Sequence, residues 1–83
     1  SIYSGDTVMD FDKVLDATGL NCPLPLLRAK KTLAGMRAGE VVQVHTTDSG
    51  AVRDFEAFAK QTGNELLDSS EEDGKFLFVL RKG

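Results

Sequence analysis

The sequence contains one cysteine, one histidine, two prolines and no tryptophan in 83 residues. Its single cysteine, Cys22, has no second cysteine with which to form an internal disulfide. Cys22 and His45 together also fall short of the roughly three or four side-chain ligands that a zinc site needs. We therefore expect a fold that rests on packing alone, with no disulfide, metal ion or other cofactor.

Long apolar runs and an export signal are also missing. No stretch approaches the roughly 20 apolar residues of a membrane-spanning helix. The opening SIYSGDTV has neither the basic start nor the apolar core of a secretory signal. An unpaired thiol is typical of a reducing compartment. These features predict a cytoplasmic protein that does not contact the membrane.

The net charge of −3 argues against nucleic acid as the main partner, because phosphate binding usually needs a basic face. The charges are unevenly distributed, with Arg28, Lys30, Lys31 and Arg37 in one short segment and an acidic run at 68–73. Both groups are typical of solvated surfaces. The alternative is that the basic segment docks on an acidic surface of a partner protein.

The length is sufficient for one apolar core, so we expect a single domain. The apolar share of 41% and the charged share of 28% are typical of a globular domain. Residues 1–10 have no useful periodicity and are predicted to form a flexible N-terminal tail, with Met9 as a candidate native start. The folded domain is expected to cover residues 11–83.

The remaining pattern predicts six elements in the order strand, helix, strand, helix, strand, strand. Strands are expected at 13–17, 40–46, 64–70 and 75–81, a first helix at 25–36, and a second helix between an N-cap at Asp48 or Ser49 and an end at Gly63 and Asn64. In the second helix, Val52, Phe55 and Ala59 are expected to face the core, with Phe58 beside them.

These elements predict an α/β (α+β) fold, a two-layer βαβαββ sandwich. Its four-stranded sheet is mixed, because a right-handed crossover makes the first two strands parallel while the final hairpin is antiparallel. Both helices then lie on one face. Leu77 and Val79 would leave the other face partly apolar, which is typical of an interaction surface. The pattern leaves the strand order open.

The segment Cys22-Pro23-Leu24-Pro25 lies where the first strand leads into the first helix. Proline is tolerated in a first helical turn and disfavours helical geometry in the residue before it, so the thiol is expected at a stiff helix entry. The positive end of the helix favours the thiolate, the form that attacks sulfur. We therefore predict that the pKa of Cys22 is below that of free cysteine, with Arg28 and Lys31 as further contributors.

Other interpretations of the same residues stay open. A lone cysteine is often a small buried apolar residue, although a strand-to-helix loop favours a reactive one. His45 ends the second strand at the expected edge of Cys22, so a Cys–His pair is one hypothesis and an ordinary surface or packing histidine is the favoured one. The phenylalanines at 55, 58, 76 and 78 have the spacing of core residues rather than of a base-stacking platform.

The stretch from Leu15 to Pro25, LDATGLNCPLP, resembles the signature LDxxGLxCPxP of the TusA/SirA-like family of sulfur carriers. Thr47-Asp48-Ser49, followed by Arg53-Asp54-Phe55, resembles the second conserved segment of that family, and the ending from Leu80 to Gly83 resembles its C-terminus. The resemblance covers about residues 13–83 and implies the same βαβαββ fold.

The resemblance implies persulfide relay through Cys22. Cys22 would accept a sulfane sulfur from a donor such as a cysteine desulfurase or rhodanese, and pass it to the cysteine of an acceptor such as a DsrE-like protein. The pathways implied are tRNA thiolation, molybdenum cofactor supply and DsrEFH-type sulfur oxidation. Pro23, Leu24 and Pro25 would shape the site. Candidate partner contacts are Arg28, Lys31, Asp48 and Arg53, with Asp48 as a cap or a contact rather than an acid–base group.

Two positions depart from the family pattern. Leu24 stands where many members have an acidic residue, and Ser49 where many have proline. Leu24 places apolar surface beside Cys22, so we expect a different choice of partner and less support for the tRNA route.

Two other functions remain as alternatives. One is a non-catalytic protein-interaction or regulatory module with a structural Cys22. The other is RNA binding, suggested by a similar fold in a bacterial translation initiation factor and opposed by the acidic charge. A monomer is expected for the sulfur carrier and for the interaction module.

Overall fold

The computed structural model describes residues 12–83, and their elements follow the predicted βαβαββ order. They are β1 (Lys13–Ala17), α1 (Leu24–Ala34), β2 (Val41–Thr46), α2 (Ala51–Thr62), β3 (Glu65–Glu72) and β4 (Lys75–Arg81). The tail predicted at residues 1–10 lies outside the described residues. The predicted fold class, a mixed four-stranded sheet with two helices, is confirmed.

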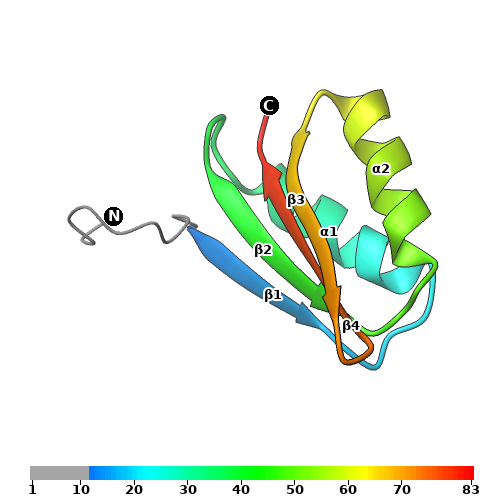
Figure 1. The fold of residues 1–83 in the computed structure, drawn as a ribbon. Helices are drawn as coiled ribbons and strands as arrows, with labels where there is room; N and C mark the ends of the chain where they lie inside the picture. Colours follow the sequence, from blue (N-terminus) through cyan, green and yellow to red (C-terminus); the bar gives the residue numbers. More distant parts are fainter. Residues whose placement is uncertain (1–11) are drawn as a thin grey trace.

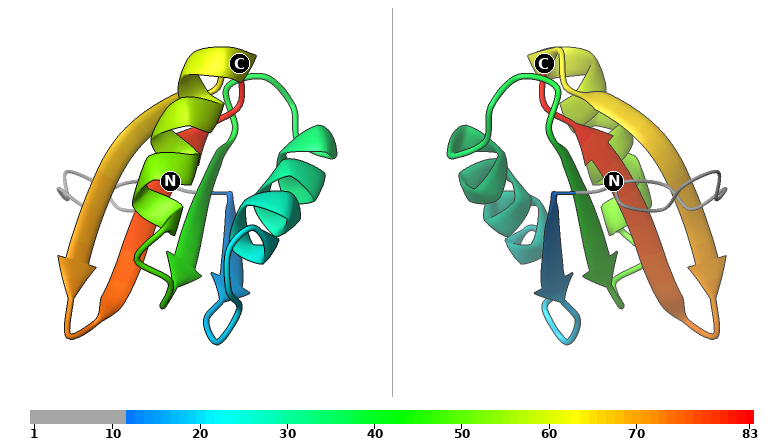
Figure 2. Two further views of the ribbon diagram at one scale, coloured as in Figure 1. Left: turned by 90° about the vertical axis from the view of Figure 1, so that its right-hand side faces the viewer. Right: turned by 90° about the vertical axis from the view of Figure 1, so that its left-hand side faces the viewer.

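The four strands form one sheet in the order β1-β2-β4-β3 (Figure 1). β1 and β2 run parallel, as predicted for strands joined by a crossover helix, whereas β4 is antiparallel to both β2 and β3. Both helices cover the same face of the sheet (Figure 2). The sheet therefore has an inner face under α1 and α2 and an outer face that neither helix covers.

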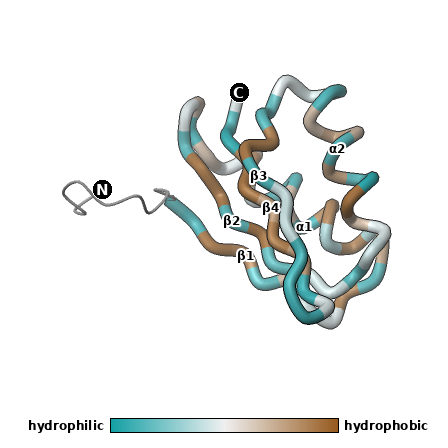
Figure 3. The backbone as a smooth tube through the Cα atoms, viewed as in Figure 1, coloured by the Kyte–Doolittle hydropathy of each residue, from teal (hydrophilic) through white to brown (hydrophobic). Residues whose placement is uncertain are grey.

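The last strand in the sequence, β4, lies inside the sheet between β2 and β3. Its residues Phe78, Val79 and Leu80 are consecutive and all buried, so this strand is apolar on both faces. Such a strand suits an interior position, where its neighbours cover it on either side. β3 carries mostly exposed polar side chains and lies at the edge, and Figure 3 shows much of it as hydrophilic.

The turn between β3 and β4 consists of Asp73 and Gly74, whose φ angles are 53° and 76°. Two successive positive φ angles define the two-residue turn whose twist matches that of an antiparallel hairpin. The Asp-Gly pair that follows the acidic side chains of β3 is therefore the turn itself.

The core lies between the helices and the inner face. Phe55 of α2 stacks on Phe78 of β4 with ring centroids 4.6 Å apart. Leu33 of α1 and Val44 of β2 are also fully or almost fully buried. Aromatic pairs in this geometry add to the free energy of burial alone. The predicted core role of these phenylalanines is confirmed, and α2 is fixed to the centre of the sheet.

Several details of α2 differ from the predictions. Its N-cap is Gly50, without a side-chain capping hydrogen bond, so neither Asp48 nor Ser49 caps it. Phe58 is a buried core residue rather than a flanking one, while Ala59 is half-buried. The buried residues Ala51, Phe55 and Phe58 follow the i, i+4, i+7 spacing of one helical face.

The boundaries of α1 also differ by one or two residues. α1 begins at Leu24 and ends at Ala34, with Gly35 as its C-cap, so Met36 follows the helix although it is buried as predicted.

The prediction of apolar surface at Leu77 and Val79 holds only in part. Val79 is 3% exposed, because it lies in register between Gln43 of β2 and Asp68 of β3, and Leu77 is half-buried. In the same row of the outer face, the exposed apolar side chain is Val14 of β1.

Candidate functional site

Cys22 lies in the loop between β1 and α1, just before the N-cap residue Pro23, and its thiol is exposed. The Cys22–Pro23 peptide bond is cis. Pro25 is buried in the first turn of α1, so its ring anchors the start of the helix in the core. The sequence pattern therefore located the thiol correctly, at a helix entry stiffened by proline.

The loop that carries Cys22 is built by the residues before it. The carboxylate of Asp16 accepts hydrogen bonds from the backbone N–H and the hydroxyl of Thr18, at 3.0 and 2.6 Å. These bonds hold the pKa of Asp16 below its usual value. Gly19 has a φ of 80°, a conformation that favours glycine, and its N–H donates to Thr47 Oγ1 at 2.9 Å. The LDxxG part of the sequence thus ties this loop to the loop after β2.

Two carboxylates hold Cys22 in place. Its backbone N–H donates to Asp48 Oδ2 at 3.0 Å, and its thiol donates to Asp54 Oδ2 at 2.7 Å. Asp48 belongs to the β2–α2 loop and Asp54 to the first turn of α2. The Asp48 carboxylate binds the Cys22 amide, whereas α2 has no side-chain capping hydrogen bond.

The surroundings of the thiol raise its pKa, so the prediction of a lowered Cys22 pKa is wrong. The largest cause is the hydrogen bond to Asp54, followed by burial and by the negative charges of Asp54 and Asp48. Neither Arg28 nor Lys31 is among the causes. A carboxylate at hydrogen-bond distance stabilises the protonated thiol and so raises its pKa.

The backbone of α1 shows a second reason. The N–H of Leu24 donates to the carbonyl of Asn21 at 2.8 Å, and that of Leu27 to the carbonyl of Pro23 at 3.0 Å. Pro25 has no N–H. The Leu24 amide is thus paired with the backbone and Pro25 has no amide hydrogen, so neither position offers a free N–H to a thiolate.

An apolar edge lies beside the thiol on α1, formed by Pro23, Leu24 and Leu27. Leu24 and Leu27 are about half exposed, although leucine is usually buried. Residues three apart on a helix are neighbours, so the two side chains form one surface. Arg28 and Lys31 are exposed further along α1, and Arg53 is exposed on α2 next to Asp54.

His45 does not form a pair with Cys22. Its Nε2 atom lies 2.9 Å from Gln43 Oε1, and it is in register with Asp16 and Leu77 on the outer face of the sheet. Neighbouring Thr46 is fully buried on the other face, so strand alternation directs His45 away from the helices. The favoured interpretation, an ordinary packing histidine, agrees with this contact.

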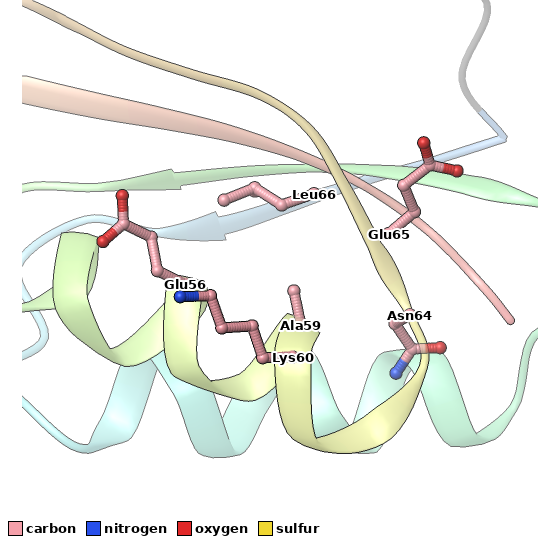
Figure 4. A pocket seen from close by; sticks show the side chains of 6 residues that line it. All are labelled: Glu56, Ala59, Lys60, Asn64, Glu65 and Leu66. Carbon is pink, nitrogen blue, oxygen red and sulfur yellow. The ribbon is translucent and has the colours of Figure 1, made fainter.

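One cavity of about 440 Å³ lies between the C-terminal half of α2 and the start of β3 (Figure 4). Its lining includes Glu56, Lys60 and Leu66, but neither Cys22 nor the two carboxylates that bind it. Enzymes that act on small-molecule substrates usually have their reactive groups in concave pockets. Cys22 does not line this cavity, and its exposed thiol is suited to a protein substrate.

Two further findings concern metals and membranes. Within residues 12–83, no three His, Cys, Asp or Glu side chains lie close enough to hold a metal ion. In the same part of the chain, every helix is too short or too polar to cross a membrane.

Asp54 is the site residue that the sequence analysis missed. It appeared only as part of the second family-like segment, while its neighbour Arg53 was proposed as a contact. The available signal was its position, because an acidic residue in the first turn of α2 lies near the ends of the parallel strands. Cys22 follows one of those strands.

Comparison with known proteins agrees with the fold and identifies the family. The chain matches the family model described as sulfurtransferase TusA over residues 13–82. It is 66% identical over 73 residues to the sulfur carrier protein TusA of Allochromatium vinosum, covering 88% of this chain and 96% of that protein. The sulfur carrier protein TusA of Pseudomonas putida GB-1 is 42% identical over 71 residues, covering 86% of this chain and 89% of its own.

The fold also matches a solved structure. The crystal structure of a SirA-like protein from Desulfitobacterium hafniense superimposes with a TM-score of 0.77 at 31% identity, covering 87% of this chain and 99% of that one. The family resemblance carried by the LDATGLNCPLP stretch is thereby confirmed, and the chain belongs to the TusA/SirA-like family of sulfur carriers.

Proposed function

We propose that this protein accepts a sulfane sulfur on Cys22 as a persulfide and relays it to the cysteine of a partner protein. The observation that carries this proposal is the exposed thiol of Cys22, the single cysteine of the chain, presented at a rigid helix entry. Exposure counts against the alternative in which Cys22 is a buried structural residue of an interaction module.

The relay consists of two thiol exchange steps. Cys22 attacks the outer sulfur of the donor persulfide, the donor S–S bond breaks, and the donor cysteine leaves as a thiol. The acceptor cysteine then attacks the terminal sulfur on Cys22 in the same way, and Cys22 becomes a thiol again. Each step depends on the thiolate of the attacking cysteine and on access to the sulfur under attack.

The surface around Cys22 suggests how partners dock. The apolar edge of Pro23, Leu24 and Leu27 offers contact area beside the sulfur. The exposed cations Arg28 and Lys31 suit a partner with an acidic surface. Arg53, next to Asp54 on α2, is a further candidate contact.

Asp48 has a different role in this proposal. Its carboxylate holds the Cys22 backbone, so we assign it to loop geometry rather than to the partner.

Donor and acceptor are proposed by chemical class. The donor is a protein persulfide, such as that of a cysteine desulfurase or rhodanese, and the acceptor is a cysteine of a protein such as a DsrE-like subunit. Leu24 gives the docking surface an apolar character, so a DsrEFH-type acceptor is the first to test, before tRNA thiolation and molybdenum cofactor supply. We place the reaction in the cytoplasm, where exposed thiols stay reduced, and expect a monomer.

The test is intact-mass spectrometry after incubation with a cysteine desulfurase and cysteine, or with a rhodanese and thiosulfate. We expect the mass of the protein to increase by one sulfur atom, a reductant to reverse the increase, and the Cys22→Ser variant to show none. If no donor loads the protein and Cys22 resists alkylation in the folded state, the interaction-module alternative replaces this proposal.

A further inference from the structure

The thiol of Cys22 donates a hydrogen bond to a carboxylate that the sulfur-relay chemistry does not itself require. Asp54 Oδ2 accepts the thiol hydrogen at 2.7 Å, and Asp54 is half-buried. The next residue, Phe55, is fully buried and stacks on Phe78, so the backbone of Asp54 is fixed to the core. Asp54 is thus held against the sulfur by the packing of α2.

The β2–α2 loop also comes close to Cys22. Gly50, the N-cap of α2, lies so near that a Cβ atom built on it would be 3.8 Å from the Cβ of Cys22 and 3.3 Å from Asp48 Oδ2. Asp48 itself holds the Cys22 amide. The sulfur therefore has two carboxylates near it, one from α2 and one from the β2–α2 loop.

These carboxylates act differently on the empty and the loaded carrier. In the empty carrier the thiol donates a hydrogen bond to Asp54, and the protonated form is stabilised, as the raised pKa of Cys22 indicates. In the loaded carrier Sγ is bonded to a second sulfur and has no hydrogen to donate. The terminal sulfur, about 2 Å further out, is more acidic than a thiol and carries negative charge, which both carboxylates repel.

We propose that Asp54 is a positioning residue that lowers the affinity of Cys22 for sulfur, so that the loaded carrier gives its sulfur readily to an acceptor. This inference rests on the proposed function, because it concerns the same persulfide. Asp54 stabilises the empty state through its hydrogen bond and destabilises the loaded state through its charge. Both effects shift the exchange equilibrium in the direction of release.

The exchange that measures this affinity uses glutathione persulfide as the sulfur source. The Cys22 S–H bond and the S–S bond of glutathione persulfide break, while a new S–S bond forms on Cys22 and a proton goes to the glutathione sulfur. The sulfur of Cys22 is oxidised by as much as that of glutathione is reduced. No further oxidant or reductant is needed.

The first measurement is the ratio of loaded to empty protein, by intact-mass spectrometry, at a fixed ratio of glutathione persulfide to glutathione. We expect this ratio to be several-fold higher in Asp54→Asn than in the wild type, with Asp54→Ala changing in the same direction. The matched control is Glu56→Gln, which removes an exposed carboxylate from the same helix. Its ratio should equal that of the wild type.

The second measurement is the rate of alkylation of the empty thiol by iodoacetamide as a function of pH. The rate follows the thiolate fraction. Removing the Asp54 carboxylate removes the largest cause that raises the pKa, so the profile of Asp54→Asn should shift to lower pH, and alkylation at neutral pH should be several-fold faster. Asp48→Asn should shift the profile less, because the Asp48 charge is the smallest cause. A merely structural role would not produce such a shift.

The outcomes separate this inference from the proposed function. If the wild type is loaded, and Asp54→Asn has the same loading ratio and the same alkylation profile, the role of Asp54 is wrong and the carrier function stands. If no donor loads the wild type, the proposed carrier function is wrong, and the inference that Asp54 lowers the sulfur affinity of Cys22 is wrong with it.

Discussion

Asp16 and Asp54 both accept hydrogen bonds through their carboxylates, but the identity of the donor determines which group has a shifted pKa. Asp16 accepts two hydrogen bonds from Thr18, which stabilise its charged form and lower its pKa. Asp54 accepts its bond from a thiol that can itself lose the proton, so the group whose pKa moves is Cys22. The Asp16 contact stabilises the loop, whereas the Asp54 contact raises the pKa of the Cys22 thiol.

The Asp16 contact predicts a pH dependence of stability. A carboxyl group with a lowered pKa in the folded state stabilises the fold above its unfolded pKa, and this contribution is lost as the pH falls through the folded value. As the pH is lowered below about 5, the urea concentration at the unfolding midpoint should therefore decrease more steeply for the wild type than for Asp16→Asn. Thr18→Val, which removes one donor, should be intermediate. Parallel curves for all three proteins would contradict this prediction.

The ends of the two helices use glycine for different reasons, although both are C-caps. Gly63 ends α2 with a φ of 76°, in the left-handed region, whereas Gly35 ends α1 with a φ of −93°. A Cβ atom at Gly63 would meet no atom within 4 Å, so the cost of substitution there is one of backbone conformation alone. At Gly35 the nearest atom would be the Thr32 carbonyl oxygen at 3.7 Å, an ordinary contact.

This difference predicts opposite effects of one substitution. Gly63→Ala should lower the free energy of unfolding by about 1 kcal/mol, because alanine disfavours positive φ. Gly35→Ala should leave it unchanged or raise it by about 0.5 kcal/mol, because it reduces the freedom of the unfolded chain without strain. Urea unfolding of both variants measures the difference. Equal destabilisation by the two substitutions would show that backbone conformation is not the cause.

At the scale of the whole molecule, the exposed thiol lies at one edge of the sheet, next to exposed apolar and basic residues of α1. This surface has the composition of a docking site in which charge steers the encounter and apolar contacts hold the complex. Exposed cations also lie on the sheet, including Lys13 of β1 and Lys75 of β4. The two groups of cations make a matched comparison possible.

We predict that Arg28→Glu combined with Lys31→Glu slows sulfur transfer from a protein donor several-fold at low ionic strength. The difference from the wild type should shrink as salt is added, because exposed charges are screened. The control is Lys13→Glu combined with Lys75→Glu, which changes the net charge equally and should have a much smaller effect. The rates are measured by intact-mass spectrometry of the loaded fraction in samples quenched at successive times. Equal slowing in both variants would assign the effect to net charge instead of docking at α1.

Local patterns were sufficient for much of this protein. Hydrophobic periodicity and the turn residues predicted the six elements and most of the core, because these depend on neighbours within a few positions. The prolines at 23 and 25 predicted a stiff helix entry at Cys22 for the same reason. The choice of strand order was not local. β4 pairs with β2, which is distant in the sequence, as well as with its sequence neighbour β3.

The chemical state of Cys22 depended wholly on the tertiary structure. Local sequence patterns predicted a lone cysteine between a strand and a helix, and this position suggested a lowered pKa. Folding brings Asp48 and Asp54, 26 and 32 residues further along the chain, into hydrogen-bond contact with Cys22, and they raise the pKa instead. Electrostatic interactions depend on distance through space, so the reactivity of this thiol was decided only when the chain had folded.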